Sequence, residues 1–205
     1  MRLLITAIAL IGSFSIAELV MGWFSHSLAL LADSGHMMSD CFALGLALLA
    51  AWIAQKTNSG SVAMGNRRVE VLAALANGIG LVALALWIGW EAIIRLHSPP
   101  MEILSLPMLA TASVGFGING VNILLLHQDS HHDLNLRGAF LHIFADAVSS
   151  VGVILAGFAV WAMKWMWADG VISLFVSGLI FISAVPLILQ SLNLLFVKSS
   201  ESSVV

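Results

Sequence analysis

The chain has 205 residues, of which 60% are apolar and only 9% are charged, and its formal net charge is −3. Ordinary globular domains carry about 25% charged residues, so this composition indicates an integral, multi-pass membrane protein with little soluble mass. The acidic balance offers no basic patch for nucleic acid. The single cysteine, Cys41, excludes an intrachain disulfide and a zinc cluster built from cysteines.

Apolar runs determine the predicted architecture. A membrane-spanning helix needs about 20 mostly apolar residues, and none of the runs alternates as a barrel strand would. We therefore predict an all-α membrane protein with six transmembrane helices. The predicted spans are Leu3–Phe24, Leu28–Ala54, Val69–Leu96, Ile103–Leu126, Leu136–Met163 and Ala168–Val197.

The first apolar run has a second interpretation, as a secretory signal peptide. Arg2, the apolar stretch that follows it and the residues "SIA" before Glu18 fit such a signal loosely. The run continues past Glu18 to Phe24, however, and this length favours a spanning helix.

The cations predict the orientation, because lysine and arginine concentrate in cytoplasmic loops. With the N-terminus in the cytoplasm, only Arg95 and Lys164 fall outside. Six cations then fall inside: Arg2, Lys56, Arg67, Arg68, Arg137 and Lys198. We therefore predict that both termini are cytoplasmic. Tryptophans at the predicted outer helix ends are typical of an interfacial aromatic belt, and they are Trp23, Trp87, Trp90, Trp161, Trp165 and Trp167.

Two of the apolar runs contain a histidine and an aspartate separated by three residues. The pairs are His36 with Asp40 in "LLADSGHMMSDC" and His142 with Asp146 in "LHIFADAVSS". An Asp at the centre of a spanning helix costs about 2.5–3.5 kcal/mol to insert, so such a residue should face a partner or a cavity. Residues i and i+4 lie on one helical face, so the two members of each pair point the same way.

Convergence of the two pairs would create a metal site. If the second and fifth helices pack together, two imidazoles and two carboxylates offer a donor set that suits tetrahedral Zn²⁺. Either pair alone could equally be a buried polar group bonded to a neighbouring helix, but two copies of one spacing favour a shared site. The predicted spans place His36 nearer the outer face and His142 nearer the inner face, so tilt or unequal helix lengths must bring them level.

These residues, in a chain of six helices, resemble the cation diffusion facilitator family of metal transporters. The segments "LLADSGHMMSD", "GNRRVEVLAALANG", "WEAIIRL" and "LNLRGAFLHIFADAVSSVGVI" are similar to its second, third and fifth helices with their approaches. The resemblance covers nearly the whole chain. It implies that His36, Asp40, His142 and Asp146 form a zinc-type transport site, with Zn²⁺, or Cd²⁺, Co²⁺ or another divalent cation, as the transported substrate.

The resemblance also implies metal efflux by alternating access, in exchange for protons and without enzymatic activity. Proton exchange agrees with the chemistry, because ligands must release protons to bind a metal. We expect residues 1–198 to form the transport domain and 199–205 a short tail, without the C-terminal cytoplasmic domain of typical members. We also expect a homodimer formed through the membrane helices and, given the compact loops, a location in the bacterial inner membrane.

Other polar residues lie close to the two pairs or elsewhere in the apolar runs. Asp33 and Ser149 share faces with the pairs, so either could support a ligand. Asp33 could also relay protons or hydrate the outer end of its helix. Interhelical hydrogen bonding is the favoured role for Glu18, Asn119 and Asn122, and lining of the transport pathway is the alternative.

Asp169 falls near a predicted helix end, where we expect water to solvate its carboxylate. The run "HQDSHHD" lies at the predicted inner mouth, between the fourth and fifth helices. It could collect metal weakly for the site, or it could be a solvated loop without a specific role, which we favour. Its candidate ligands are His127, His131, His132 and Asp133.

Two alternative functions follow from the same residues. "HQDSHH" fits a histidine box of membrane di-iron oxidoreductases, but such a site draws histidines from several boxes. The other histidines of this chain stand in no box, so we disfavour the enzyme. A passive channel for divalent metals is the second alternative, and it would move zinc without regard to a pH gradient.

Overall fold

The computed structural model describes residues 2–56, 60–99, 102–127 and 134–201, and six α-helices account for most of them. Side chains are described for 8–43, 71–99, 102–121 and 146–195, and at 45, 46, 48 and 49. The helices are α1 (Arg2–Ser25), α2 (Leu28–Lys56), α3 (Gly60–His97), α4 (Ser105–His127), α5 (Leu134–Met163) and α6 (Trp167–Glu201).

Each of the six predicted spans corresponds to one helix, which confirms the predicted fold class; the fourth helix begins at Ser105, two residues later than predicted. The main difference lies at α3, which begins at Gly60, within the segment predicted to connect the second and third helices. That segment contains no proline that would stop a helix. Four helices contain, within the described residues, an apolar stretch long enough to cross a membrane: Ile8–Ser25, Val71–His97, Asp146–Met163 and Trp167–Leu195.

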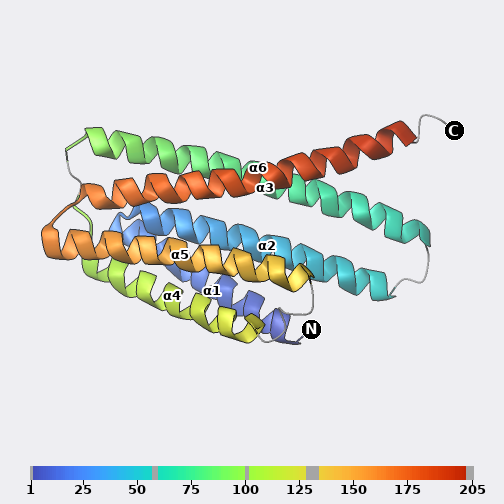
Figure 1. Ribbon diagram of the computed structural model, residues 1–205, viewed down its shortest axis with the longest axis horizontal. Helices are drawn as coiled ribbons and strands as arrows, with labels where there is room; N and C mark the ends of the chain where they lie inside the picture. The colour runs from blue at the N-terminus through green and yellow to red at the C-terminus, as the bar shows by residue number, and fades with distance from the viewer. Residues whose placement is uncertain (1, 57–59, 100–101, 128–133, 202–205) are drawn as a thin grey trace.

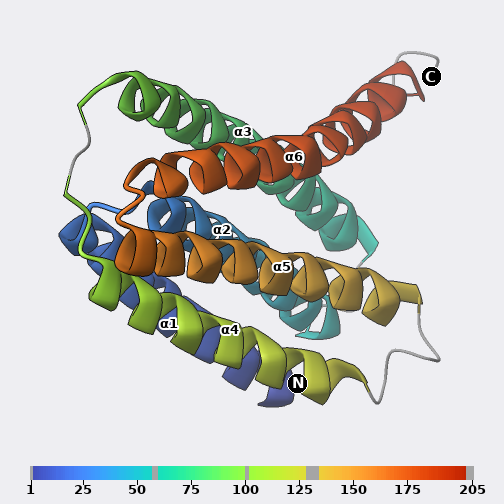
Figure 2. The ribbon, with the colours of Figure 1, turned by 60° about the vertical axis from the view of Figure 1, so that its left-hand side comes forward.

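The helices run side by side along the long axis of the molecule, and consecutive helices are antiparallel (Figure 1). α3 and α6 pack against each other on one side, and α1, α2, α4 and α5 form a group beside them (Figure 2). α2 contacts α1, α3, α5 and α6, so it is the central helix of the bundle. α1 begins and α6 ends at the same end of the bundle, as the prediction that both termini lie on one side requires (Figure 1).

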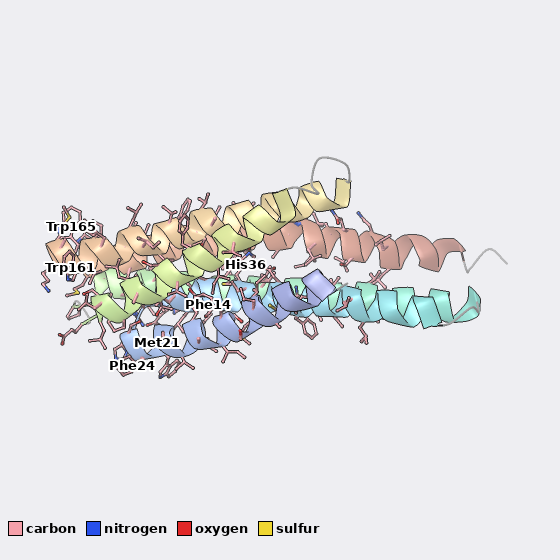
Figure 3. The ribbon with its side chains drawn as sticks, turned by 90° about the horizontal axis from the view of Figure 1, so that it is seen from below. Phe14, Met21, Phe24, His36, Trp161 and Trp165 are labelled. Atoms are coloured by element: carbon pink, nitrogen blue, oxygen red, sulfur yellow. The ribbon has the colours of Figure 1, made fainter. Side chains whose placement is uncertain are left out.

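The opposite end of the bundle, where α1 turns into α2 and α5 into α6, carries exposed aromatic side chains, and we call it the tryptophan end. Trp161 and Trp165 lie there in Figure 3. Trp165 and Trp167 stack, with ring centroids 5.2 Å apart. The six tryptophans predicted for the belt are between 45% and 73% exposed. Exposed indole rings near one end of an apolar bundle are typical of a membrane–water interface.

Two apolar clusters hold α2 in the centre of the bundle. One cluster joins α2 to α3 and α6 and includes Leu31 and Ile88. The other joins α2 to α4 and α5 and includes Leu30, Met108 and Val153. Because adjacent residues of α2 pack in different clusters, the helix is fixed in rotation, and the directions of its polar side chains are fixed with it.

Asp169, in the first turn of α6, is completely buried, so the prediction that water solvates it was wrong. It accepts hydrogen bonds from the Ser27 hydroxyl (2.6 Å) and from the backbone N–H groups of Leu28 (2.9 Å) and Ala29 (3.3 Å). These N–H groups belong to the first turn of α2, where a helix leaves its donors without internal partners. Asp169 therefore ties the start of α6 to the start of α2.

Candidate metal site

Three of the four predicted ligands meet between α2 and α5. His36 Nε2 lies 3.6 Å from Asp40 Oδ2 and 3.4 Å from Asp146 Oδ1. One potential ligand atom from each residue lies within 4.8 Å of the other two. Zinc bonds to nitrogen and oxygen of about 2.0–2.2 Å place two ligands of a tetrahedron about 3.4 Å apart. The spacing of the three side chains therefore suits a small divalent ion.

The fourth predicted ligand, His142, lies one helical turn before Asp146 on α5. The side chain of His142 is outside the described residues, whereas the backbone of α5 is described there. Residues i and i+4 share one helical face, so the helix places His142 on the face of α5 that carries Asp146.

The sequence placed the polar pair of α2 nearer the outer face than the pair of α5. In the structure Asp40 and Asp146 lie at the same depth, because α2 and α5 end at different heights. At 1.5 Å per residue, Asp40 lies about 18 Å from the start of α2, and Asp146 lies about 26 Å from the end of α5. α5 projects past α2 at the tryptophan end (Figure 1). This projection compensates for the difference, and the two carboxylates are brought level.

The three side chains are largely enclosed by the bundle. Their side-chain exposures are 13% for His36, 17% for Asp40 and 11% for Asp146. Figure 3 shows His36 midway along the group of helices, far from Trp161 and Trp165 at the tryptophan end. Ionisable groups at such a depth are costly unless they pair with one another or with an ion. Two carboxylates and an imidazole so close together form a strongly cation-attracting centre.

A second layer of polar contacts lies beside these three side chains. Asp33 is 3% exposed and accepts hydrogen bonds from the hydroxyls of Ser149 (2.9 Å) and Ser150 (3.4 Å). The Asn119 amide donates to the Ser150 hydroxyl (3.3 Å). The network links α2, α4 and α5. Asn119 forms the interhelical hydrogen bond that the sequence predicted for it. Ser150 was not singled out in the sequence, although it lies four residues after Asp146.

Glu18, on α1, is 1% exposed, and its Oε2 atom has no hydrogen-bond partner among the described residues. The interhelical hydrogen bond favoured for it is therefore not found for this atom. The side chains of Asn122 and His127 are outside the described residues, as is the run that contains His131, His132 and Asp133.

A bundle of six antiparallel helices, with apolar spans and buried ionisable groups, defines an integral, multi-pass membrane protein. Residues 4–196 match the family model of the cation efflux transmembrane domain, and the chain belongs to this cation efflux family. The recognition of a cation diffusion facilitator in the sequence is thereby confirmed.

Several curated relatives are similar over nearly the whole of this chain. It is 36% identical over 196 residues to the cadmium, cobalt and zinc/H(+)-K(+) antiporter of Bacillus velezensis, an alignment that covers 95% of this chain and 62% of the relative. It is 39% identical over 194 residues to the zinc transporter ZitB of Escherichia coli, covering 94% and 61%. It is 37% identical over 194 residues to the metal cation efflux system protein CzcD of Cupriavidus metallidurans, covering 95% and 61%. The chain thus spans about three fifths of the length of these relatives.

Proposed function

We propose that the protein exports divalent metal cations, with Zn²⁺ as the main substrate and Cd²⁺ and Co²⁺ as further substrates. His36, Asp40 and Asp146, with His142 as the fourth donor, would carry the ion. The observation that supports this most strongly is the approach of three potential ligand atoms to within 4.8 Å, from two helices, inside a membrane bundle. The names of the relatives, which describe zinc, cadmium and cobalt transport, support the same substrates.

Charge balance supports an exchange of metal for protons. Imidazole and carboxylate side chains bind a metal only when they are deprotonated, so binding releases their protons. When the ion leaves, two carboxylates in a poorly solvated site need replacement charge, and protons supply it. Alternating access about such a site would move metal in one direction and protons in the other. The antiporter name of the Bacillus velezensis relative supports this coupling.

The same proposal assigns a location and an assembly. The six-to-two distribution of cations supports a cytoplasmic location for both termini, and the tryptophan end would then face the opposite side of a bacterial inner membrane. Residues 1–198 act as the transport domain, with 199–205 as its tail. Two copies form a homodimer through their membrane helices.

Purified protein in liposomes tests the proposed function. The lumen contains a fluorescent zinc indicator, and zinc is added outside with and without an acidic lumen. We expect the pH gradient to accelerate zinc uptake, and we expect Asp146→Asn to abolish that uptake because it removes a charge and leaves the side chain's size unchanged. Glu102→Gln, at an exposed position between α3 and α4, is the matched control. Full uptake by Asp146→Asn would contradict the proposed site, and indifference to the gradient would indicate a passive channel.

A further inference from the structure

Glu18 is a buried carboxyl group that the proposed metal site does not use. It is 1% exposed, and its Oε2 atom has no hydrogen-bond partner within the described part of the chain. An ionised carboxylate in this position would carry an uncompensated buried charge, which costs several kcal/mol. A protonated carboxyl is neutral and avoids that cost. Glu18 is therefore built to hold a proton within the bundle.

Glu18 lies at nearly the same depth as Asp33. Glu18 lies seven positions before the end of α1 at Ser25, and Asp33 lies five positions after the start of α2 at Leu28. At 1.5 Å per residue, the two carboxyls lie about 10 Å and about 8 Å from the turn that joins the helices. α1 and α2 pack against each other, so the two carboxyls lie at similar depths on neighbouring helices.

The helices packed against α1 are α2 and α4. α2 carries Asp33 and His36 near the depth of Glu18, about 8 Å and about 12 Å from its start at Leu28. Its Cys41 lies further along and contacts the Ile8 carbonyl at 3.7 Å. Gly115 of α4 lies beside Glu18, since a methyl group at Gly115 would lie 3.7 Å from Glu18 Oε1. Residues 105–121 of α4 include no titratable side chain. Among the described side chains of α2 and α4, Asp33 is therefore the carboxyl group nearest in depth to Glu18.

Asp33 connects Glu18 to the proposed metal site. It lies one turn before His36 on α2. It also accepts the hydrogen bond from Ser149, which is one turn after Asp146 on α5. Glu18 on α1, Asp33 on α2 and Asp146 on α5 thus form a row of carboxyl groups across the bundle.

We propose that Glu18 is the proton-carrying residue of the transport cycle and that it exchanges its proton with the metal site through Asp33. The proposal rests on the proposed function. A proton leaves the Glu18 carboxyl and bonds to the Asp33 carboxylate, and Asp33 then passes a proton to the site that the metal has left. Glu18 recovers a proton from water in the state that opens toward the tryptophan end. No electron moves, and each transferred proton is replaced.

The test compares Glu18→Gln with the wild type in three measurements: zinc binding by calorimetry, zinc–zinc exchange across liposomes at equal pH, and zinc uptake driven by a pH gradient. Glutamine keeps the size of the side chain and removes its titration. We expect binding and exchange to match the wild type, and we expect the acceleration by the pH gradient to be lost. Glu18→Asp, which stays titratable, should recover part of that acceleration. Glu102→Gln is the control.

Two results would overturn the proposal. One is full gradient-driven uptake in Glu18→Gln, which would show that the proton does not pass through this residue. The other is an equal loss of binding, exchange and gradient response in both Glu18→Gln and Glu18→Asp, which would indicate a structural role. If Glu18→Gln does not fold, Glu18→Met makes the same test with an apolar side chain of similar size. Failure of the proposed function itself is distinguishable, because the wild type would then not transport zinc.

Discussion

His36 Nε2 and Asp146 Oδ1 lie 3.4 Å apart, and this contact joins the polar face of α2 to the polar face of α5. Asp40 belongs to the same group because it lies one turn from His36 on the same helix. A metal ion held here would contact residues from two helices, so any relative movement of α2 and α5 would change its coordination. Metal binding at this contact would therefore depend on the relative position of α2 and α5.

Removal of one carboxylate should weaken zinc binding strongly. Loss of a residue that merely supports a ligand typically lowers metal affinity 10–100-fold, so we expect Asp40→Asn, which loses a proposed ligand charge, to lower zinc affinity by at least about 100-fold. Isothermal titration calorimetry in detergent measures this directly. A dissociation constant equal to that of the wild type would remove Asp40 from the site.

Acidic pH should weaken zinc binding. The proposed ligands bind zinc only when they are deprotonated, so protons compete with the ion and are released when it binds. We expect the zinc dissociation constant to rise as the pH falls. Titrations in buffers with different ionisation enthalpies should detect the released protons. A dissociation constant independent of pH, with no protons released, would contradict metal–proton competition at this site.

Replacement of His36 by Asp should change the preference among metals. The substitution exchanges a nitrogen donor for an oxygen donor, and a more oxygen-rich site favours harder ions such as Mn²⁺ over Zn²⁺. We expect the ratio of zinc to manganese transport to fall in liposomes. His97→Asp is the matched control, because His97 is exposed at the end of α3, away from the three ligand atoms. An unchanged ratio in His36→Asp would exclude His36 as a determinant of selectivity.

Asp169 should matter for stability rather than for metal preference. Asp169→Ala leaves the Ser27 hydroxyl and two N–H groups at the start of α2 without their acceptor. Because each buried donor left without its acceptor costs about 1–3 kcal/mol, we expect a clearly lower melting temperature in detergent. Ser173→Ala, one turn further along α6, removes only a local bond to the Asp169 carbonyl and should change little. Equal melting temperatures for the two variants would refute the anchoring role.

Much of the fold could be predicted from the sequence, because each apolar run is long enough to span a membrane by itself. The pairing of His36 with Asp40 followed from helix geometry alone, since residues four apart share a face. The contact between His36 and Asp146 required the further assumption that the second and fifth helices pack together. The recurrence of one spacing on both helices supported that assumption.

The errors arose where a side chain bonds to a part of the chain remote in sequence. Asp169 stands near the start of a helix, and nothing in its neighbourhood indicates that it caps a different helix, α2. The partners of Asp33 were equally hidden, because Ser149 and Ser150 reach it only when α2 and α5 pack at one particular rotation. The start of α3 at Gly60 was missed because polar residues and glycine were interpreted as a loop.

The most direct test of the account is a zinc-soaked crystal, with diffraction recorded at energies above and below the zinc absorption edge. We predict an anomalous peak between α2 and α5, at about 2.0–2.2 Å from the donor atoms of His36, Asp40 and Asp146. A peak elsewhere, with these three side chains apart from one another and from the ion, would contradict the proposed metal site.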